Sequence, residues 1–286
     1  MSYAAIDVGS NSCRLLIAEK DHSELRILYK EIETTRIGAG LNQTGQISEE
    51  AAQRSWRWLE KIQPLLKAYN VQHYRAVATS AVREAANGKM FVEEAARRSQ
   101  MPVETISGEE EARLSYIGVK KGLQLEHSPL VVDLGGGSTE IICNDQDFVI
   151  SLPVGAVRAT EMQMSAADIA ERLQPVQGMQ SRFMEYPLVM VGGTASTLAS
   201  VKLGLEIYDS RKVHGHRVTH REIADIYQLL ERTPLALRKR LPGLQPERAD
   251  IINAGVLITM LIMDMLQKNE LIVSDSDLLQ GIIWSL

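Results

Sequence analysis

The 286-residue chain is poor in cysteine, with only Cys13 and Cys143, and this scarcity excludes the disulfide framework of small secreted proteins. Both cysteines fall within apolar segments that we predict as strands, so we interpret them as small core residues. The sequence also lacks an apolar run long enough to span a membrane. The run at residues 254–266 is interrupted by Asp264 and is too short to cross a bilayer.

The chain begins without the pattern of a secretory signal, because Asp7 lies inside its first apolar run. We therefore expect a cytoplasmic protein. Positive charge is not in excess either, since 31 Lys and Arg stand against 36 Asp and Glu and the formal net charge is −5. With no global field to attract a polyanion, an anionic substrate needs a local basic group or a metal ion. We predict neither a nucleic-acid polymer nor a membrane as a partner.

What the chain does contain is a segment in which glycine interrupts two apolar runs, LVVDLGGGSTEIIC at residues 130–143. The runs predict two buried strands joined by a hairpin. Three glycines remove every Cβ at its tip, so the backbone could take positive φ and gather N–H groups around an anion. Asp133 cannot bind a phosphate directly, but it can hold a divalent metal that does. A plain tight hairpin is the alternative, and it needs positive φ at only one or two positions.

The same pattern occurs near the N-terminus, where residues 4–17, AAIDVGSNSCRLLI, align with residues 130–143. The repeat predicts two like domains, at residues 1–120 and 121–286, each presenting an acidic strand end and a phosphate-binding hairpin to a shared cleft. The final helix could pack back on the first domain. Arg14 aligns with Glu140, and whereas an arginine suits a phosphate, a carboxylate suits a metal or its water.

Two further turns lead from a predicted strand into a predicted helix, which is a geometry that favours anions. In the first, residues 74–78 deliver Thr79 and Ser80 into a helix that carries Arg83 in its first turn. Arg83 either points toward the site or is simply solvated, and the residues alone do not separate these alternatives. In the second turn, the Gly192-Gly193 pair is by itself a weak signal, because close packing of strand and helix is its ordinary explanation.

An acidic cluster, SGEEEAR at residues 107–113, begins another predicted helix. Ser107 and Glu110 have the spacing of a capping box, which gives Glu110 a structural use. Glu111 is left over, one position further into the helix. A carboxylate there could serve as a general base for water, although a solvated helix start is the ordinary meaning of such a cluster.

The densest basic stretch is RKVHGHRVTHR at residues 211–221. Thr219 and Glu222 predict a capping box for the helix that follows. The remaining cations and histidines suggest a loop facing a polyanion, whereas metal binding is disfavoured because no acidic or cysteine partner lies nearby. Farther along, we expect one continuous helix over residues 156–173 and another from Pro246 to Leu266.

Several segments, in order and spacing, resemble the exopolyphosphatase/guanosine pentaphosphate phosphatase (Ppx/GppA) family: IDVGSNSCRLLI, ATSAVREAANG, SGEEEARLSYIGV, VVDLGGGSTEI, SLPVGAVR, VGGTASTL, KVHG, PERADIINAGVLI and SDSDLLQGI. The resemblance implies an α/β protein with two ribonuclease-H-like domains of the actin, sugar-kinase and heat-shock-chaperone ATPase superfamily around a central cleft. It also implies release of a terminal phosphate from inorganic polyphosphate or guanosine pentaphosphate, with Mg²⁺ or another divalent cation. Family analogy suggests a homodimer. Long members carry an extra C-terminal helical domain that this sequence ends before, so we expect weaker handling of very long chains.

The resemblance assigns roles to individual positions. It places the catalytic glutamate on Glu111, with Glu110 as the alternative one residue away. It implies metal binding by Asp7, Asp133 and Glu140. Phosphate binding falls to Gly9, Ser10, Asn11, Ser12, Arg14, Arg83, Gly135, Gly136, Gly137, Ser138 and Thr139.

Two rival functions stay open at this point. A small-molecule kinase of the same superfamily would share both loops but would depend on ATP. A non-catalytic sensor of polyphosphate or an alarmone would bind without releasing phosphate. The acids at positions 111, 133 and 140 argue against a sensor, because a binder of anions would gain from neutral or basic residues there. The sequence does not distinguish polyphosphate from guanosine pentaphosphate, since both present the same terminal anhydride.

Overall fold

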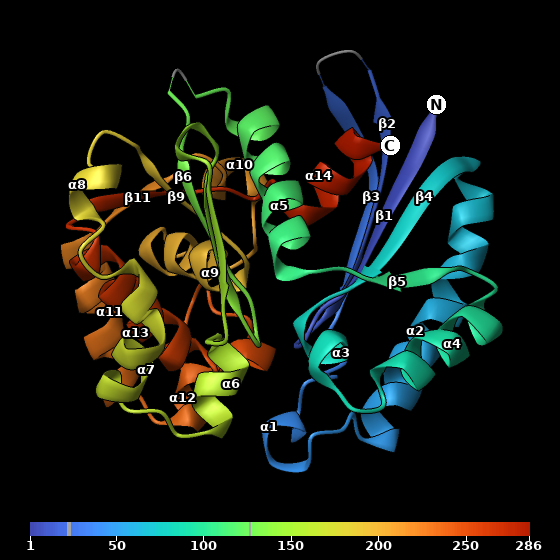
Figure 1. Ribbon diagram of the computed structural model, residues 1–286, viewed down its shortest axis with the longest axis horizontal. Helices are drawn as coiled ribbons and strands as arrows, with labels where there is room; N and C mark the ends of the chain where they lie inside the picture. Colours follow the sequence, from blue (N-terminus) through green and yellow to red (C-terminus); the bar gives the residue numbers. More distant parts are fainter. Residues whose placement is uncertain (22–23, 126) are drawn as a thin grey trace. The chain divides into compact units, whose positions relative to one another are not determined.

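The computed structural model describes residues 1–21, 24–125 and 127–286, and the chain divides into two compact units. Unit 1 comprises Met1–Lys121 together with Asp277–Leu286, and unit 2 comprises Gly122–Ser276. The chain therefore passes between the units twice. Figure 1 traces this path by colour: unit 1 comprises the segment that runs from blue through cyan to the green of α5, together with the final red segment.

Unit 1 is built on a five-stranded sheet in the order β3-β2-β1-β4-β5. Strand β1 pairs antiparallel with β2 and parallel with β4, β2 pairs antiparallel with β3, and β4 pairs parallel with β5. The strands are β1 (Ser2–Val8), β2 (Cys13–Lys20), β3 (Leu25–Glu33), β4 (Val71–Ala78) and β5 (Val103–Thr105).

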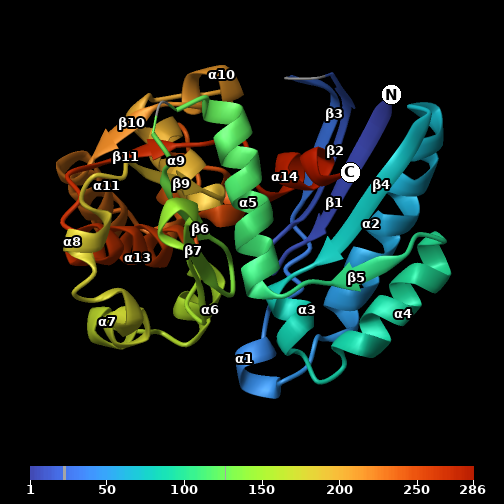
Figure 2. The same ribbon diagram turned by 45° about the horizontal axis from the view of Figure 1, so that its top comes forward.

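Helices cover both faces of this sheet: α1 (Leu41–Thr44), α2 (Glu49–Ala68), α3 (Ser80–Glu84), α4 (Gly88–Ser99), α5 (Gly108–Leu123, which runs into unit 2) and α14 (Leu278–Ser285). The Ser48 hydroxyl caps α2 by accepting a hydrogen bond from the Ala51 N–H at 3.3 Å. Figures 1 and 2 both show α2 and α4 on one face and α14 on the other.

Successive side chains of β1 point to opposite faces of the sheet, and this alternation decides which helices each side chain faces. Ala4, Ile6 and Val8 belong to the core cluster shared with α2 and α4, whereas Ala5 packs with α14. Asp7 therefore points to the α14 face of the sheet. The same alternation along β2 sends Arg14 to that face as well.

Helices α5 and α14 touch through their backbones, at two glycines. A Cβ on Gly118 would lie 2.0 Å from the carbonyl oxygen of Asp277, and a Cβ on Gly281 would lie 1.8 Å from that of Leu114. No side chain fits at either point, so the positions of the two helices are fixed relative to each other.

Unit 2 contains a six-stranded sheet in the order β10-β11-β9-β6-β7-β8. Its path β8-β7-β6-β9-β11 repeats β3-β2-β1-β4-β5, with the same antiparallel and parallel pairings. The repeat predicted from sequence is thus present in the topology. The strands are β6 (Leu130–Leu134), β7 (Thr139–Cys143), β8 (Phe148–Leu152), β9 (Leu188–Val191), β10 (Arg217–Thr219) and β11 (Glu270–Val273).

One apolar core joins this sheet to its helices, and Figures 1 and 2 both show α11 and α13 side by side. The helices are α6 (Ala156–Glu161), α7 (Ala166–Leu173), α8 (Gln180–Phe183), α9 (Gly193–Lys202), α10 (Ser210–Val213), α11 (His220–Arg232), α12 (Leu235–Arg238) and α13 (Ile252–Met265), with 3₁₀ turns η1 (Asn144–Gln146), η2 (Gln174–Val176) and η3 (Pro246–Arg248). Both cysteines are buried and free, as predicted. In the described ranges, no helix has the length and apolar character to cross a membrane.

The two long helices predicted in unit 2 are wrong in extent. Residues 156–173 form α6 and α7, because Ser165 and Asp168 make a capping box that starts a new helix. Residues 246–266 form η3 and then α13. The guanidinium of Arg248 packs against Gly193, where a Cβ on the glycine would lie only 1.7 Å from Arg248 Nη1. This tertiary contact with α9 holds η3 in its position before α13.

The basic stretch at residues 211–221 is not a single loop. It forms α10, a turn, the edge strand β10 and the start of α11. The predicted capping box of Thr219 and Glu222 is present. Arg217 pairs with Glu270, and His220 Nε2 lies 2.8 Å from Asp264 Oδ1, so part of the charge is balanced within unit 2.

Candidate functional site

The two predicted hairpins have the same turn. The Gly9 N–H donates to the Ser12 carbonyl at 3.1 Å, and the Gly135 N–H donates to the Ser138 carbonyl at 3.0 Å. A Cβ would lie 3.0 Å from the Ser12 oxygen in the first turn and 3.2 Å from the Ser138 oxygen in the second. Glycine is therefore favoured at the start of each turn by close approach of the backbone.

The expectation of positive φ at the triple glycine is wrong. The described glycines with positive φ do not include Gly135, Gly136 or Gly137. Instead, the loop packs against the start of α6, where a Cβ on Gly155 would lie 2.6 Å from the Gly136 carbonyl. Close packing therefore requires glycine at position 155, where a side chain would collide with the backbone of the loop.

This packing orients the peptide groups of the loop. The Gly135 carbonyl accepts from the Ala156 N–H at 3.0 Å, the Gly136 carbonyl accepts from two N–H groups of α6, and the Gly137 carbonyl accepts from Arg158 Nε at 2.6 Å. In a trans peptide the N–H points opposite to the carbonyl. The N–H groups of residues 136–138 therefore all point away from α6, which is an arrangement suited to an anion.

The first hairpin is held in a similar way by a different segment. The Ser10 and Asn11 carbonyls accept from the N–H groups of Gly38 and Arg36, each at 2.9 Å. The N–H groups of Asn11 and Ser12 consequently point to the other side. Ser10, Asn11 and Ser12 are all buried.

In unit 1 an acid at the end of β1 is paired with a guanidinium. Asp7 and Arg14 are register partners, and Arg14 Nε and Nη2 lie 2.8 and 2.7 Å from Asp7 Oδ2. Arg14 also binds Asp277. Burial raises the pKa of Asp7, against the lowering influence of Arg14. The other oxygen, Asp7 Oδ1, is buried and has no hydrogen-bond partner among the described residues.

In unit 2 the equivalent positions both carry acids. Asp133 and Glu140 are register partners on β6 and β7, and both alternate with residues of the main core, so they share the face turned away from it. Glu140 is 1% exposed, and its Oε1 accepts from the Ser151 hydroxyl at 2.7 Å. The hydroxyl of Thr139, predicted to bind phosphate, donates to the Val154 carbonyl at 2.5 Å.

These donor sets fit a hard divalent cation. Mg²⁺ takes oxygen ligands and commonly uses only one or two protein carboxylates, keeping waters and substrate phosphates as the rest. Asp133 with Glu140 provides such a pair, and the unpartnered Asp7 Oδ1 is an oxygen that a metal-bound water could satisfy. Within the residues that the structure describes, no group of three or more His, Cys, Asp or Glu side chains is gathered.

Glu111, in the first turn of α5, is 8% exposed and lies beside Arg83. Arg83 Nη1 donates to Glu111 Oε2 at 3.2 Å and to the Ile106 carbonyl at 3.0 Å. Arg83 is therefore not simply a solvated residue. Glu110 differs, since its side chain is 44% exposed and binds Arg75. Only the Ser107 half of the predicted capping box is observed, with the Ser107 hydroxyl accepting from the Glu110 N–H at 3.1 Å.

The two strand-to-helix turns also have structural explanations. The Thr79 N–H donates to the Val8 carbonyl at 3.3 Å, and the Ser80 hydroxyl donates to Glu84 at 2.8 Å. Gly192 has φ +95°, and a Cβ there would lie 2.6 Å from the Leu134 carbonyl. Each turn packs directly against the end of a hairpin strand.

Comparison with known proteins decides the family. Residues 16–286 match the Ppx/GppA phosphatase family. The chain belongs to this family. Membership in this Ppx/GppA phosphatase family confirms the resemblance seen in the sequence and supports phosphohydrolase activity.

Relatives align along nearly the whole chain. Exopolyphosphatase 2 of Mycobacterium tuberculosis is 33% identical, covering 99% of this chain and 98% of that protein. A bifunctional 3-dehydroquinate synthase/phosphatase of Fusobacterium nucleatum is 32% identical over 98% of this chain, which spans only 46% of that relative. The solved Aquifex aeolicus PPX-GPPA enzyme is 32% identical, with a TM-score of 0.82 over 100% of this chain and 99% of that one. The neighbouring structures have the actin-like ATPase fold, as predicted.

Sequence reasoning missed one residue that contacts a predicted site residue. Asp277 caps α14 and binds Arg14, although the two residues are 263 positions apart. The SDSD motif before the final helix was visible as part of the family resemblance. The spacing of Asp277 and Gln280 also matches a capping box, but nothing local connects that motif to Arg14.

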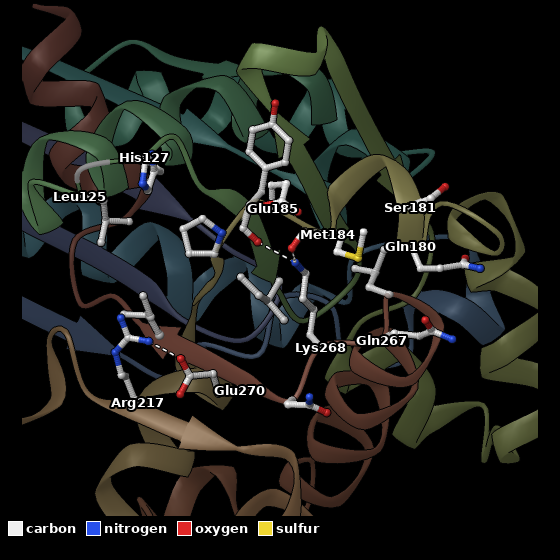
Figure 3. A pocket seen from close by; sticks show the side chains of 16 residues that line it. Leu125, His127, Gln180, Ser181, Met184, Glu185, Arg217, Gln267, Lys268 and Glu270 are labelled. Atoms are coloured by element: carbon white, nitrogen blue, oxygen red, sulfur yellow. Dashed lines mark hydrogen bonds and ion pairs between the residues drawn. The ribbon is translucent and has the colours of Figure 1, made fainter.

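A pocket of a different kind lies elsewhere in unit 2 of this Ppx/GppA family member. The pocket has a volume of about 680 Å³ and lies near the first residues of β9 and β11 (Figure 3). The β6–β7 turn is at the other end of this sheet's parallel strands. Two of the cationic side chains that line the pocket, Lys268 and Arg217, bind other groups of unit 2. Lys268 donates to the Phe183, Met184 and Tyr186 carbonyls at 2.7, 3.0 and 2.7 Å, and Arg217 pairs with Glu270. None of the predicted site residues lines it.

Proposed function

We propose that this Ppx/GppA family member is a phosphohydrolase that releases terminal orthophosphate from inorganic polyphosphate, the 5′-terminal phosphate of guanosine pentaphosphate, or both. The observation that carries the proposal is the buried carboxylate of Glu111 held by Arg83. A buried acid beside a cation, in the first turn of a helix, has the chemistry of a catalytic base.

Glu111 activates a water molecule for in-line attack on the terminal phosphorus. The adjacent guanidinium of Arg83 stabilises the ionised carboxylate that must accept the proton, and the Ile106 carbonyl holds that guanidinium in place. The exposed side chain of Glu110, bound to Arg75, is less suited to this role. No protein nucleophile is needed.

The hairpin turns bind the phosphates in this proposal. The outward N–H groups of residues 136–138, together with those of Asn11 and Ser12, donate to phosphoryl oxygens. Arg14 and Arg83 add positive charge near the bound anion.

Asp133 and Glu140, with a contribution from Asp7, would hold the divalent cation. When bound, such an ion neutralises charge on the phosphoryl oxygens. The chain's own carboxylates orient it, and Ser151 in turn fixes Glu140. Arg14 already balances Asp7, so unit 2 carries the greater need for a cation.

Known relatives support the substrate class. The M. tuberculosis relative is an exopolyphosphatase by name, and it aligns with almost the entire chain. Polyphosphate and guanosine pentaphosphate share a terminal phosphoanhydride, so the same loops can serve either. The homodimer suggested by family analogy and the cytoplasmic location stay predictions.

The decisive assay measures phosphate release from polyphosphate, guanosine pentaphosphate and ATP, side by side, with Mg²⁺ and then with chelator. We expect release from at least one of the first two substrates and its loss with chelator. Binding of polyphosphate or guanosine pentaphosphate without release under any divalent metal would identify a sensor. A reaction that requires both ATP and an acceptor would identify a kinase.

A further inference from the structure

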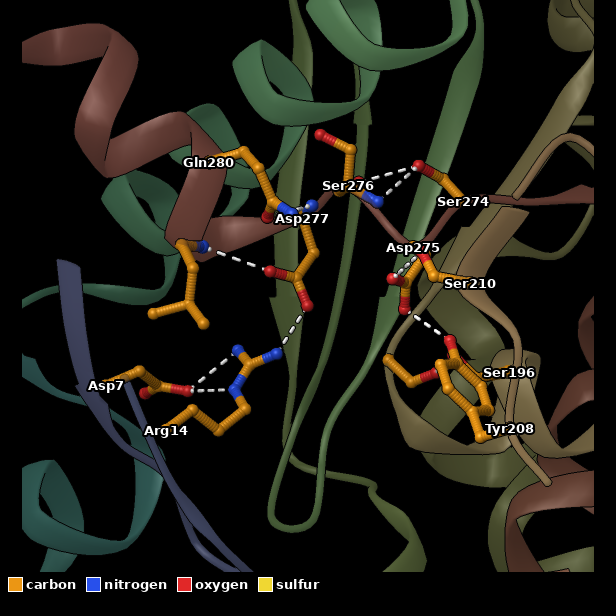
Figure 4. A network of polar contacts seen from close by, with 12 residues as sticks. Asp7, Arg14, Ser196, Tyr208, Ser210, Ser274, Asp275, Ser276, Asp277 and Gln280 are labelled. Carbon is orange, nitrogen blue, oxygen red and sulfur yellow. Dashed lines mark hydrogen bonds and ion pairs between the residues drawn. The ribbon is translucent and has the colours of Figure 1, made fainter. Parts of the chain in front are cut away.

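Asp277 is the first residue of the segment that returns to unit 1, and its side chain has two separate uses. Oδ1 accepts from the Leu279 N–H at 3.0 Å, which caps α14, while the Asp277 N–H donates to Gln280 Oε1 at 3.0 Å. Oδ2 binds the Nη1 of Arg14. Figure 4 shows the carboxylate pointing toward Arg14 and away from the polar groups around Asp275.

Capping alone does not require this residue type. Asn and Ser cap helices as well as Asp, because a single oxygen suffices. The second oxygen carries the contact with Arg14, and the negative charge that strengthens this contact is not needed for capping. That guanidinium is thereby held from two sides, by Asp7 through Nε and Nη2 and by Asp277 through Nη1. The side chains are 21%, 5% and 13% exposed for Arg14, Asp7 and Asp277, so water screens these contacts only in part.

The backbone of Asp277 cannot move easily. Gly118 of α5 approaches its carbonyl so closely that a Cβ would lie 2.0 Å away, and Gly281 makes a similar contact with Leu114. Helix α5 is also the helix that carries Glu111. Arg14 is therefore anchored, through Asp277, to the same rigid pair of helices as Glu111.

We propose that Asp277 is a positioning residue that holds the Arg14 guanidinium in the orientation needed for phosphate binding. The inference rests on the proposed function and deepens it, because it adds a residue on which phosphate binding depends. Without the Asp277 carboxylate, Arg14 loses the charged partner of its Nη1, and the bond to Asp7 through Nε and Nη2 fixes the guanidinium less tightly. A misplaced cation then stabilises the charge on the phosphoryl oxygens less well.

The test is Asp277→Asn, which retains an oxygen for the Leu279 N–H but presents an uncharged group to Arg14. We expect an unchanged melting temperature and a kcat/KM for phosphate release that falls about 10- to 100-fold, as for residues that orient a ligand. The matched control is Asp275→Asn, which removes the same charge from the same segment. Asp275 binds the hydroxyls of Tyr208 and Ser210 at 2.5 and 2.6 Å, and we expect nearly normal activity.

A double-mutant cycle shows whether Asp277 acts through Arg14. In an Arg14→Ala background, Asp277→Asn should change kcat/KM by less than about twofold, since coupled residues are not additive. An equal loss in both backgrounds would place the role of Asp277 elsewhere and overturn the inference. If Asp277→Asn unfolds, Asp277→Ser supplies a shorter cap that does not reach Arg14.

A second readout needs no activity. The Arg14 Nη1–H resonances of the unliganded protein, which report the contact with Asp277, should exchange slowly with solvent in the wild type and faster in Asp277→Asn. Exchange that does not change in the variant would overturn the positioning role. If the wild type releases phosphate from no substrate, the proposed function fails, and this measurement still decides the role of Asp277.

Discussion

Asp133 stands opposite Glu140 across the β6–β7 ladder, at the register position where Asp7 stands opposite Arg14 across β1–β2. The two units share a topology and a turn, yet they differ in charge at this one equivalent position. Unit 1 neutralises its acid with its own guanidinium. Unit 2 has two neighbouring carboxylates, and like charges directly opposite destabilise a sheet unless something compensates them.

The first prediction concerns this acidic pair. Glu140→Gln should raise the Mg²⁺ concentration needed for half-maximal phosphate release by about tenfold or more, because a carboxylate donor is lost. Ser151→Ala removes only the hydrogen bond that orients Glu140 and should give a smaller shift in the same direction. Titration of activity with Mg²⁺ measures both. An unchanged requirement in Glu140→Gln would remove Glu140 from the metal site.

The second prediction concerns the proposed base. Glu111→Gln should lower the rate of phosphate release by at least about 100-fold, since an amide cannot accept the proton from water. The melting temperature should stay close to that of the wild type, because the amide oxygen can still accept from Arg83. Glu110→Gln is the control, with nearly normal activity expected. Full activity in Glu111→Gln would move the base to another residue.

The third prediction concerns the turn after β9. Gly192 has φ +95° and ψ 174°, a region open almost only to glycine, and a Cβ there would meet the Leu134 carbonyl. Gly192→Ala should lower the free energy of unfolding by about 1–3 kcal/mol from backbone strain, with more from the contact. Gly204→Ala, at φ +60° in open space, is the control and should cost about 1 kcal/mol. Urea denaturation of both variants compares them, and equal losses would contradict the packing argument.

The fourth prediction is a pH dependence of stability. The hydrogen bond from Lys202, with that from the Thr219 N–H, lowers the pKa of Glu222 from 4.5 to about 2. Because the folded pKa is depressed, the folded state favours the ionised carboxylate. Its contribution is present above pH 4.5 and is lost as the pH falls toward about 2. The side chain is 38% exposed, so the effect is modest.

The measurement is the difference in unfolding free energy between the wild type and Glu222→Gln. This difference should be constant near neutral pH and should shrink on acidification through the window from pH 4.5 to about 2. A difference that grows in that window would have the wrong sign for a depressed pKa.

The hairpins and the acids at their strand ends could be predicted because their signals are local. Asp7 and Asp133 end apolar runs, and strand alternation then fixes which face each acid occupies. The same local reasoning identified the capping box of Thr219 and Glu222. Such patterns depend on residues only a few positions apart, and tertiary packing did not alter them.

The features that were missed depend on distant partners. Nothing near Arg14 in the sequence indicates that it contacts Asp277. Nothing in the triple glycine itself indicates that hydrogen bonds from the N–H groups of α6 orient the carbonyls of this loop. The edge strand β10 was hidden for another reason. It has three residues, Arg217–Thr219, and its pairing with β11 supplies the order that its own composition does not suggest.

The return of α14 to unit 1 sets an order for assembly during translation. Its apolar residues Leu278, Leu279, Ile282 and Ile283 complete the core on one face of the first sheet, with Ala5, Leu16 and Val77. The ribosome makes this helix only after all of unit 2 has been made. Unit 2 can therefore fold as a whole while one face of unit 1 still exposes an apolar surface. Unit 1 is synthesised first but completes its folding last. Its apolar surface is therefore exposed to chaperones and proteases for longer than that of unit 2.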